Sequence, residues 1–233
     1  MGIWKRVGDA FDSGAGSVVA LFDWLGGLLG GIADPATRRQ VAFSVAMIAL
    51  SAKMAKADGI VTTDEVEAFR RIFVVEAREE RSVRRLFDLA TRDVAGFESY
   101  AARIAGIYGN DVHGLTDVVD GLFAIARADG ALHEAELVYL ERVAGIFGID
   151  GAAFERIAER HVVGAEGDPY IVLGVGRGLP LAEIRRQYLK LVAESHPDKL
   201  IARGVPPECI AVANQRLAAI NRAYERIERE LRG

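Results

Sequence analysis

Apolar residues recur every three or four positions over most of this 233-residue chain. That spacing places them on one face of a helix, whereas a half-buried strand would alternate apolar and polar residues. No stretch of useful length alternates in this way. We therefore predict an all-α fold, with a bundle of helices between residues 34 and 161. The helical stretches of that bundle are expected at about residues 41–52, 63–76, 81–94, 98–108, 112–128, 134–147 and 151–160.

Residues 41–52 are the most apolar stretch of this bundle. The stretch is too short to cross a bilayer, which takes about 20 residues. A helix that is apolar on all sides belongs in a core, so we expect it to be the central buried helix. The pair Asp34-Pro35 marks a helix start, because Asp is a favoured N-cap and Pro fits the first helical position.

Two further amphipathic patterns lie near the C-terminus, from Leu181 to Ser195 and from Pro207 onward. The triplet His196-Pro197-Asp198 follows the first pattern. Proline fixes its own φ and lacks a backbone donor, so Pro197 is expected to end the helix and fix a turn. We expect the imidazole and the carboxylate to point into solvent at the tip of a helical hairpin. The two helices should pack through an apolar stripe, with Leu181, Ile184, Tyr188, Leu191 and Val192 against Leu217, Ile220 and Tyr224.

The triplet and its surroundings resemble a J domain, from Asp168 to about Arg232. Residues 168–175 (Asp-Pro-Tyr-Ile-Val-Leu-Gly-Val) are similar to the first short helix of that domain, and residues 183–188 to the start of its second helix. Residues 217–225 resemble the end of its third helix. The loop of residues 199–208 is similar in particular to the DjlA-like branch of the family, which carries a TerB-like helical domain ahead of its J domain.

The resemblance implies a co-chaperone that recruits a DnaK-type ATPase chaperone and stimulates its ATP hydrolysis. Asp198 would pair with an arginine of the partner's ATPase domain, while His196 and Pro197 hold the turn. A basic strip beside the triplet would meet an acidic groove of the partner. Leu189 stands where the family usually has a second basic residue, so this strip is thinner than in other members. The partner-binding residues implied in this way are Arg185, Arg186, Lys190, His196, Pro197, Asp198 and Lys199.

The bundle contains an internal repeat. Residues 55–66 recur as residues 126–137, each copy with Ala-Asp-Gly in its first half, at an offset of 71 residues (129 − 58). This repeat resembles the TerB fold, which uses such a helix–turn–helix unit twice. If the two copies pack about a pseudo-two-fold axis, four carboxylates converge, and Ca²⁺ or Mg²⁺ would favour such oxygen ligands. These candidate ligands are Asp58, Glu65, Asp129 and Glu136.

Helix capping is the alternative role for the same carboxylates, and we favour it over metal binding. Thr62-x-x-Glu65 is a capping-box pattern, in which the glutamate accepts a hydrogen bond from a backbone N–H at the helix start. Asp58-Gly59 suits a helix end, where Gly adopts the left-handed conformation. His133 occupies the cap position of the second copy and serves less well there, so the metal alternative stays open.

Charge divides the chain into two parts. The net charge is −4, but residues from Asp168 onward hold 11 Lys and Arg against 8 Asp and Glu (+3), and the preceding residues hold 18 against 25 (−7). A mildly basic part favours an acidic protein partner and lacks the strong basic footprint of a nucleic-acid-binding protein. The single Cys209 permits no internal disulfide and fits a reducing compartment. No nucleophile–base pair or phosphate-binding loop is present, so we predict that the chain is not an enzyme.

Residues 1–33 include a Gly-rich apolar segment, residues 18–33. This segment is shorter than a usual membrane span and contains Asp23. In one interpretation it touches a membrane surface or a second subunit, with Trp4 and Trp24 as interfacial anchors. In the other it packs on the protein's own core. We expect a cytoplasmic protein, with the cytoplasmic face of the inner membrane as the place of any lipid contact.

Taken together, the patterns predict an apolar segment at residues 1–33, a TerB-like helical domain at 34–161, a linker at 162–167 and a J domain at 168–233. The TerB-like domain would supply client choice, location or ion sensing, and a Ca²⁺ or Mg²⁺ ion is the one cofactor considered. The alternative function is a stress-linked, divalent-ion-binding helical scaffold. In that case the J-like hairpin is only a docking surface.

Overall fold

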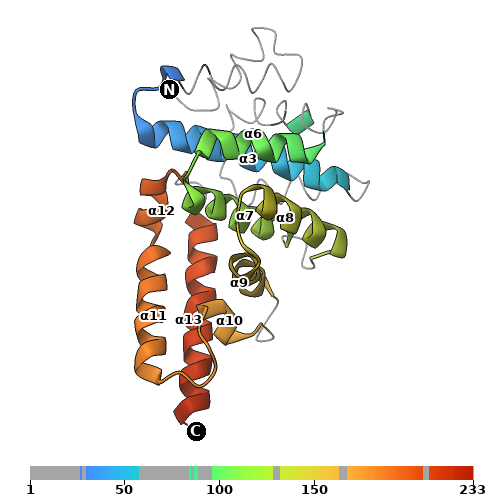
Figure 1. Cartoon of the computed structure of the whole chain (residues 1–233). Helices are drawn as coiled ribbons and strands as arrows, with labels where there is room; N and C mark the ends of the chain where they lie inside the picture. Colours follow the sequence, from blue (N-terminus) through green and yellow to red (C-terminus); the bar gives the residue numbers. More distant parts are fainter. Residues whose placement is uncertain are drawn as a thin grey trace.

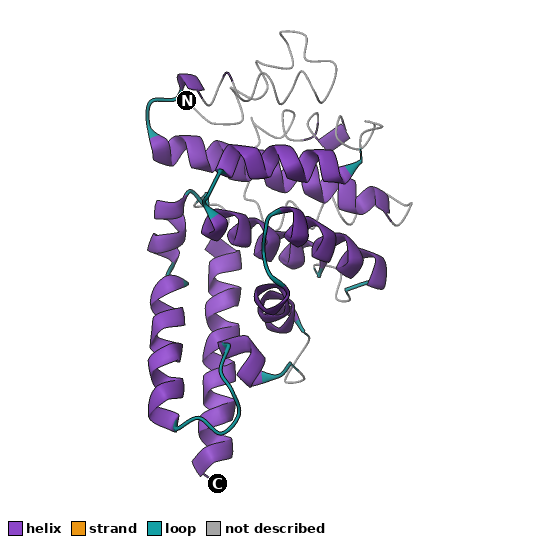
Figure 2. Cartoon of the chain, in the orientation of Figure 1, coloured by secondary structure: helices purple, strands orange, loops and turns teal. Residues whose placement is uncertain are grey.

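A computed structural model of the chain describes residues 27, 30–57, 84, 87–88, 96–127, 132–162, 167–206 and 210–232. These residues form helices joined by loops, which confirms the predicted all-α fold (Figures 1 and 2). The helices are α3 (Pro35–Ala57), α6 (Phe97–Tyr108), α7 (Val112–Ala126), α8 (Glu134–Ile146), α9 (Gly151–His161), α10 (Pro169–Leu173), α11 (Leu181–Glu194), α12 (Pro197–Arg203) and α13 (Ile210–Arg232).

Helix α3 is the centre of the N-terminal bundle. Residues 41–54 are all buried, which confirms the predicted central helix. Asp34 caps its start, since the carboxylate accepts a hydrogen bond from the Thr37 N–H at 2.9 Å. Helices α6, α7 and α8 pack around α3. The crossing with α7 is close, because a Cβ at Gly121 would lie 2.9 Å from Cε of Met47.

A second, smaller core joins α10, α11 and α13. Ile184 and Ile220 are buried in it, and the rings of Tyr188 and Tyr224 stack with centroids 4.3 Å apart. The predicted apolar stripe between the two long helices is therefore present. Leu181 and Leu217 are only partly buried. In Figure 1, α11 and α13 form a long hairpin that leads away from the bundle.

The segment after the triplet is helical where the sequence predicted a loop. Helix α12 runs from Pro197 to Arg203, so its last five residues lie within the loop expected at residues 199–208. Proline both ends one helix and suits the first position of the next, and here it takes the second role. His196 is the N-cap, and Gly204 closes the helix in the left-handed conformation at φ 101°. Helix α11 had already ended at Glu194.

The hairpin tip packs against the bundle on one side. Leu200, Val205, Val212 and Ala213 are buried in the same core cluster as α3 and α7. Figure 1 shows α12 lying next to the start of α3, with α13 beginning beside α7. The side chain of Arg39 donates to the Ala202 carbonyl at 3.1 Å. The hairpin tip thus shares the larger core with the bundle, while the rest of the hairpin packs in the smaller one. The predicted domain boundary at residues 162–167 stays a prediction.

Gly204 lies at the contact between α12 and α3. A Cβ at Gly204 would collide with the Cβ of Arg39, and its φ of 101° is unfavourable for any L side chain. We expect Gly204→Ala to lower the free energy of unfolding by about 3 kcal/mol, from backbone strain and overpacking together. Urea unfolding of the full chain measures this loss.

Gly178→Ala is the matched control for that variant. Gly178 has φ 89°, but a Cβ there would meet nothing within 4 Å. Its substitution should cost only the backbone strain of about 1–2 kcal/mol. Equal losses in the two variants would show that α12 does not pack on α3 in solution.

No helix in the described ranges is long and apolar enough to cross a membrane. Most of residues 1–33, with Trp4 and Trp24, lies outside those ranges.

Candidate functional site

The triplet holds its two polar side chains in solvent, as the sequence predicted. The side chains of His196 and Asp198 are 57% and 88% exposed. His196 Nδ1 accepts a hydrogen bond from the Asp198 N–H at 3.2 Å. Pro197 fixes the backbone between them at the first position of α12. The result is a carboxylate at a fixed place on the surface, free to meet a cation of another protein.

The basic residues predicted to accompany the triplet are also on the surface. Arg185, Arg186 and Lys190 are exposed on α11, and Lys199 is exposed on α12. None of the four makes an ion pair with another described residue. Leu189 lies among them and is 53% exposed, so the strip includes one apolar position. Such a surface suits a partner with an acidic groove.

Arg203 ties the segment around the triplet to the bundle. Its Nε and Nη2 donate to the Asp117 carboxylate of α7 at 3.0 and 3.2 Å. Its Nη1 donates to the Glu194 carbonyl at the end of α11, at 3.3 Å. Arg203 therefore fixes both the helix before the triplet and the helix after it to the same carboxylate.

A second arginine, Arg216 of α13, lies deeper between the two parts. Its Nη1 donates to Asp117 at 2.8 Å and its Nε to Asp120 at 2.6 Å. The three side chains are 8%, 3% and 1% exposed. Arg160 and His161 of α9 also contact Asp120, at 2.9 and 3.0 Å. We name this group the ion cluster: Asp117, Asp120, Arg160, His161, Arg203 and Arg216.

Charge pairing in the ion cluster controls the ionisation of Asp120. Burial alone would raise its pKa, but the charges of Arg160 and Arg216 and the hydrogen bond from His161 hold the pKa well below its usual range. Burial would likewise lower the pKa of Arg216, and the two aspartates raise it above its usual value. Both groups are therefore charged at neutral pH, and the cluster is an electrostatic anchor.

Comparison with known proteins gives two findings. The family described as "Tellurite resistance protein TerB" matches residues 44–159. "Co-chaperone protein DjlA" of Photobacterium profundum is 28% identical over an alignment that covers 82% of this chain and 79% of that protein. The protein of the same name from Vibrio cholerae is 26% identical, with the same coverage of 82% and 79%. This chain is DjlA-like and carries a TerB-like domain.

A further relative supports this assignment with higher identity over a shorter stretch. "Co-chaperone protein DjlA" of Escherichia coli K12 is 34% identical over an alignment that covers 45% of this chain and 47% of that protein. No solved structure matches the chain. In this DjlA-like protein the TerB match runs from within α3 to within α9, so α10–α13 with the triplet lie beyond it.

The ion cluster is the feature that sequence reasoning missed. Its signal in the sequence is weak: Asp117 and Asp120 stand three apart in the otherwise apolar residues 117–126 of α7. Carboxylates inside a buried helix need cationic partners, because an unpaired buried charge is costly. The partners themselves could not be named, since Arg203 and Arg216 are 86 and 99 positions away from Asp117.

Three of the four candidate metal ligands, Asp58, Glu65 and Asp129, lie outside the described residues. The fourth, Glu136, is at the start of α8, where its carboxylate accepts the His133 N–H at 2.9 Å. Any metal would compete with that capping bond. A Ca²⁺ or Mg²⁺ site at these carboxylates remains a proposal, and calorimetric titration of the protein with each ion would test it.

Proposed function

We propose that this DjlA-like protein is a co-chaperone that recruits a DnaK-type chaperone and stimulates its ATP hydrolysis. The named relatives support the co-chaperone role and favour a regulator over an enzyme. The observation that carries the proposed recruitment of a DnaK-type chaperone is the Asp198 carboxylate, which is 88% exposed at the start of α12. Among the described residues, Asp198 makes its one ion-pair contact with His196, whose Nδ1 lies 3.6 Å from the carboxylate.

In the proposed mechanism, Asp198 offers its carboxylate to a guanidinium of the partner's ATPase domain. Charge-assisted pairs of this kind are short, directional and stronger than neutral hydrogen bonds. His196 and Pro197 hold the carboxylate in place at the helix start. The hydrolysis itself takes place in the chaperone. The co-chaperone shifts the chaperone toward its hydrolytic state by binding that state more tightly than the resting one.

Single-turnover ATP hydrolysis by a DnaK-type chaperone, with and without this protein, tests the proposal. We expect faster hydrolysis when the protein is added. A chaperone that responds to another J protein but not to this one would refute it.

The basic strip on α11 should set the rate of association. We expect Arg185→Glu with Arg186→Glu to raise the concentration needed for half-maximal stimulation by about tenfold or more, because the acidic groove would now repel the strip. The effect should shrink at high salt, where surface charges are screened. Stimulation measured at two salt concentrations gives both results.

Arg142→Glu is the control for that charge reversal. Arg142 is exposed on α8, away from the triplet. It should leave half-maximal stimulation unchanged. A similar loss in this variant would mean that overall charge, and not the strip, determines association.

We further propose that the TerB-like domain and residues 1–33 determine where this co-chaperone acts and which client it serves. The proposed location is the cytoplasm. We also propose lipid contact at the cytoplasmic face of the inner membrane, and this second proposal rests on the Gly-rich apolar segment with Trp4 and Trp24. Flotation with anionic liposomes would test it, and a protein that stays in the unbound fraction would contradict it.

A further inference from the structure

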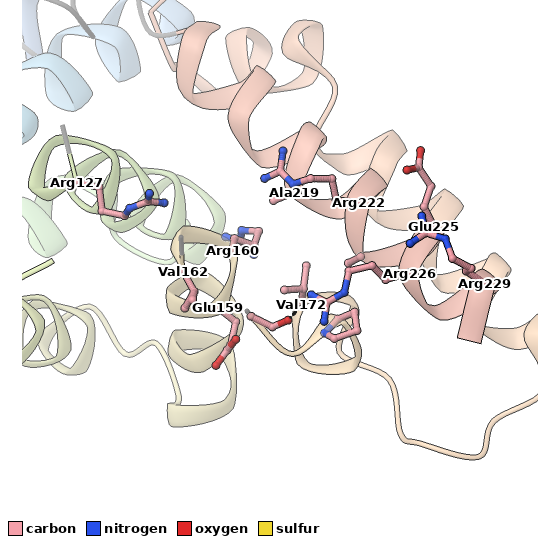
Figure 3. A pocket seen from close by; sticks show the side chains of 13 residues that line it. Arg127, Glu159, Arg160, Val162, Val172, Ala219, Arg222, Glu225, Arg226 and Arg229 are labelled. Atoms are coloured by element: carbon pink, nitrogen blue, oxygen red, sulfur yellow. Dashed lines mark hydrogen bonds between the residues drawn. The ribbon is translucent and has the colours of Figure 1, made fainter. Parts of the chain in front are cut away.

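A pocket of about 560 Å³ lies where α9 of the bundle faces α10 and α13 (Figure 3). Its volume is in the range of small-molecule sites. Arginines from both parts of the chain line it. Arg127 and Arg160 come from the bundle side, and Arg222, Arg226 and Arg229 come from α13. In a chain whose net charge is −4, this gathering of five guanidinium groups is a local exception.

Carboxylates of the pocket do not neutralise these arginines. Arg160 is paired with Asp120 of the ion cluster. The other four arginines face two acidic lining residues, Glu159 and Glu225, which leaves an excess of two positive charges. The Glu159 carboxylate accepts the Asp168 N–H at 2.8 Å. Neither glutamate makes an ion pair with a described arginine. The pocket therefore presents a positive field to any ligand that enters it.

Two buried N–H groups in the pocket wall lack acceptors among the described residues. They are Nε of Arg127 and Nε of Arg160. Arg160 uses Nη2 for Asp120, and Arg226 donates Nη1 to the Gly167 carbonyl at 2.6 Å. A buried donor without an acceptor is costly, so a ligand that brings acceptor oxygens would favour turning of these guanidinium groups toward it.

The spacing of the α13 arginines indicates an extended anion. Arg222, Arg226 and Arg229 are four and three residues apart, which places them on one face of the helix over about 10 Å of its length. A single phosphate would reach only part of this row, whereas linked phosphates could meet it along its length. Guanidinium groups bind phosphate oxygens in bidentate pairs.

The apolar part of the wall argues against a ligand that needs base stacking. Its apolar side chains are small and aliphatic, such as Val162, Val172 and Ala219, and no aromatic ring is among the described lining residues. We propose that this pocket binds a small molecule with two or more linked phosphate groups, between the TerB-like domain and α13. This site is separate from the triplet and does not depend on the proposed chaperone partner.

A ligand in this pocket would bridge the two parts of the protein. It would contact α9 on one side and α13 on the other, so its binding would stabilise their docking, increasingly as the free ligand concentration rises. We therefore expect a rise in melting temperature with ligand concentration, in addition to direct binding.

Calorimetric titration of the full chain with tripolyphosphate, at constant ionic strength, tests the proposal. We expect one molecule bound per chain, with pyrophosphate weaker and orthophosphate and sulfate weaker still. The double variant Arg222→Gln, Arg229→Gln should weaken tripolyphosphate binding about tenfold or more, since it removes two charge-assisted contacts. Both side chains are exposed, so the variant should keep its fold.

Arg185→Gln with Arg186→Gln is the matched control, because it removes the same charge from exposed positions outside the pocket. It should leave tripolyphosphate binding within about twofold of the unaltered protein. Equal weakening by the two double variants would overturn the proposal in favour of non-specific attraction. Sulfate binding as tight as tripolyphosphate would also overturn it. A glutamate-rich peptide that binds where tripolyphosphate does not would assign the pocket to an acidic protein segment instead.

Discussion

Replacing Asp198 by Asn is expected to abolish the stimulation of ATP hydrolysis by a DnaK-type chaperone. The amide has nearly the same shape as the carboxylate but carries no charge for a guanidinium of the partner. Loss of one member of a charge pair at an interface costs about 2–5 kcal/mol, which is roughly 30-fold or more in affinity. Because the side chain is 88% exposed, the fold should be unaffected. Single-turnover hydrolysis measures the loss.

Glu183→Gln provides the comparison for this variant. It neutralises another exposed carboxylate in the same part of the chain, in the first turn of α11. Stimulation should persist there, and melting curves of both variants should match that of the unaltered protein. If Asp198→Asn stimulates as well as the unaltered protein, the assignment of the triplet as the partner-binding site is wrong.

Replacing Arg216 by Met is expected to produce the largest loss of stability, about 3–5 kcal/mol. Arg216 pairs with both Asp117 and Asp120, and the two carboxylates are 3% and 1% exposed. Without Arg216, they keep only the contacts with Arg203 and with Arg160 and His161. Uncompensated buried charge is the cause of the loss, and urea unfolding measures it.

Two further observations would separate this cause from a loss of packing. Gln215→Met changes the neighbouring exposed position of α13 and should alter stability by no more than about 0.5 kcal/mol. The pKa of Asp120 is depressed in the folded protein, so its contribution is complete above the ordinary Asp pKa of about 3.9 and is lost as pH falls through the lower folded value. The difference between Arg216→Met and the unaltered protein should therefore narrow in acid. A difference that is independent of pH would indicate packing alone.

The spacing of apolar residues predicted the individual helices of this protein better than it predicted how those helices pack together. The buried helix at residues 41–52 and the pairing of Ile184 with Ile220 follow from helical spacing. The residues that form one buried face of a helix are only three or four positions apart, so a short stretch of sequence is enough to identify them. Helix α12 was missed because it is seven residues long, too short for a periodic signal, and because Pro197 is equally a stop and a start.

The docking of the hairpin on the bundle could not be predicted from the sequence. Leu200 and Val212 would have been equally suited to a core within the hairpin, and nothing local indicates that they belong to the core of α3 and α7. The same is true of Arg216. Nothing in the sequence around Arg216 indicates that its side chain is buried and pairs with Asp120, which is 96 positions away. A hydrophobic pattern identifies a buried face but not its partner.

The shared core has a consequence for the order of synthesis. Helices α3 and α7 precede α12 in the chain, so they can assemble before the triplet has left the ribosome. Leu200, Val205 and Arg203 then find their partners already in place. A nascent or damaged protein whose bundle has not formed would leave α12 without its supports, and its triplet would be mobile. Under the proposed function, only a protein whose bundle has formed would present the triplet correctly to the chaperone.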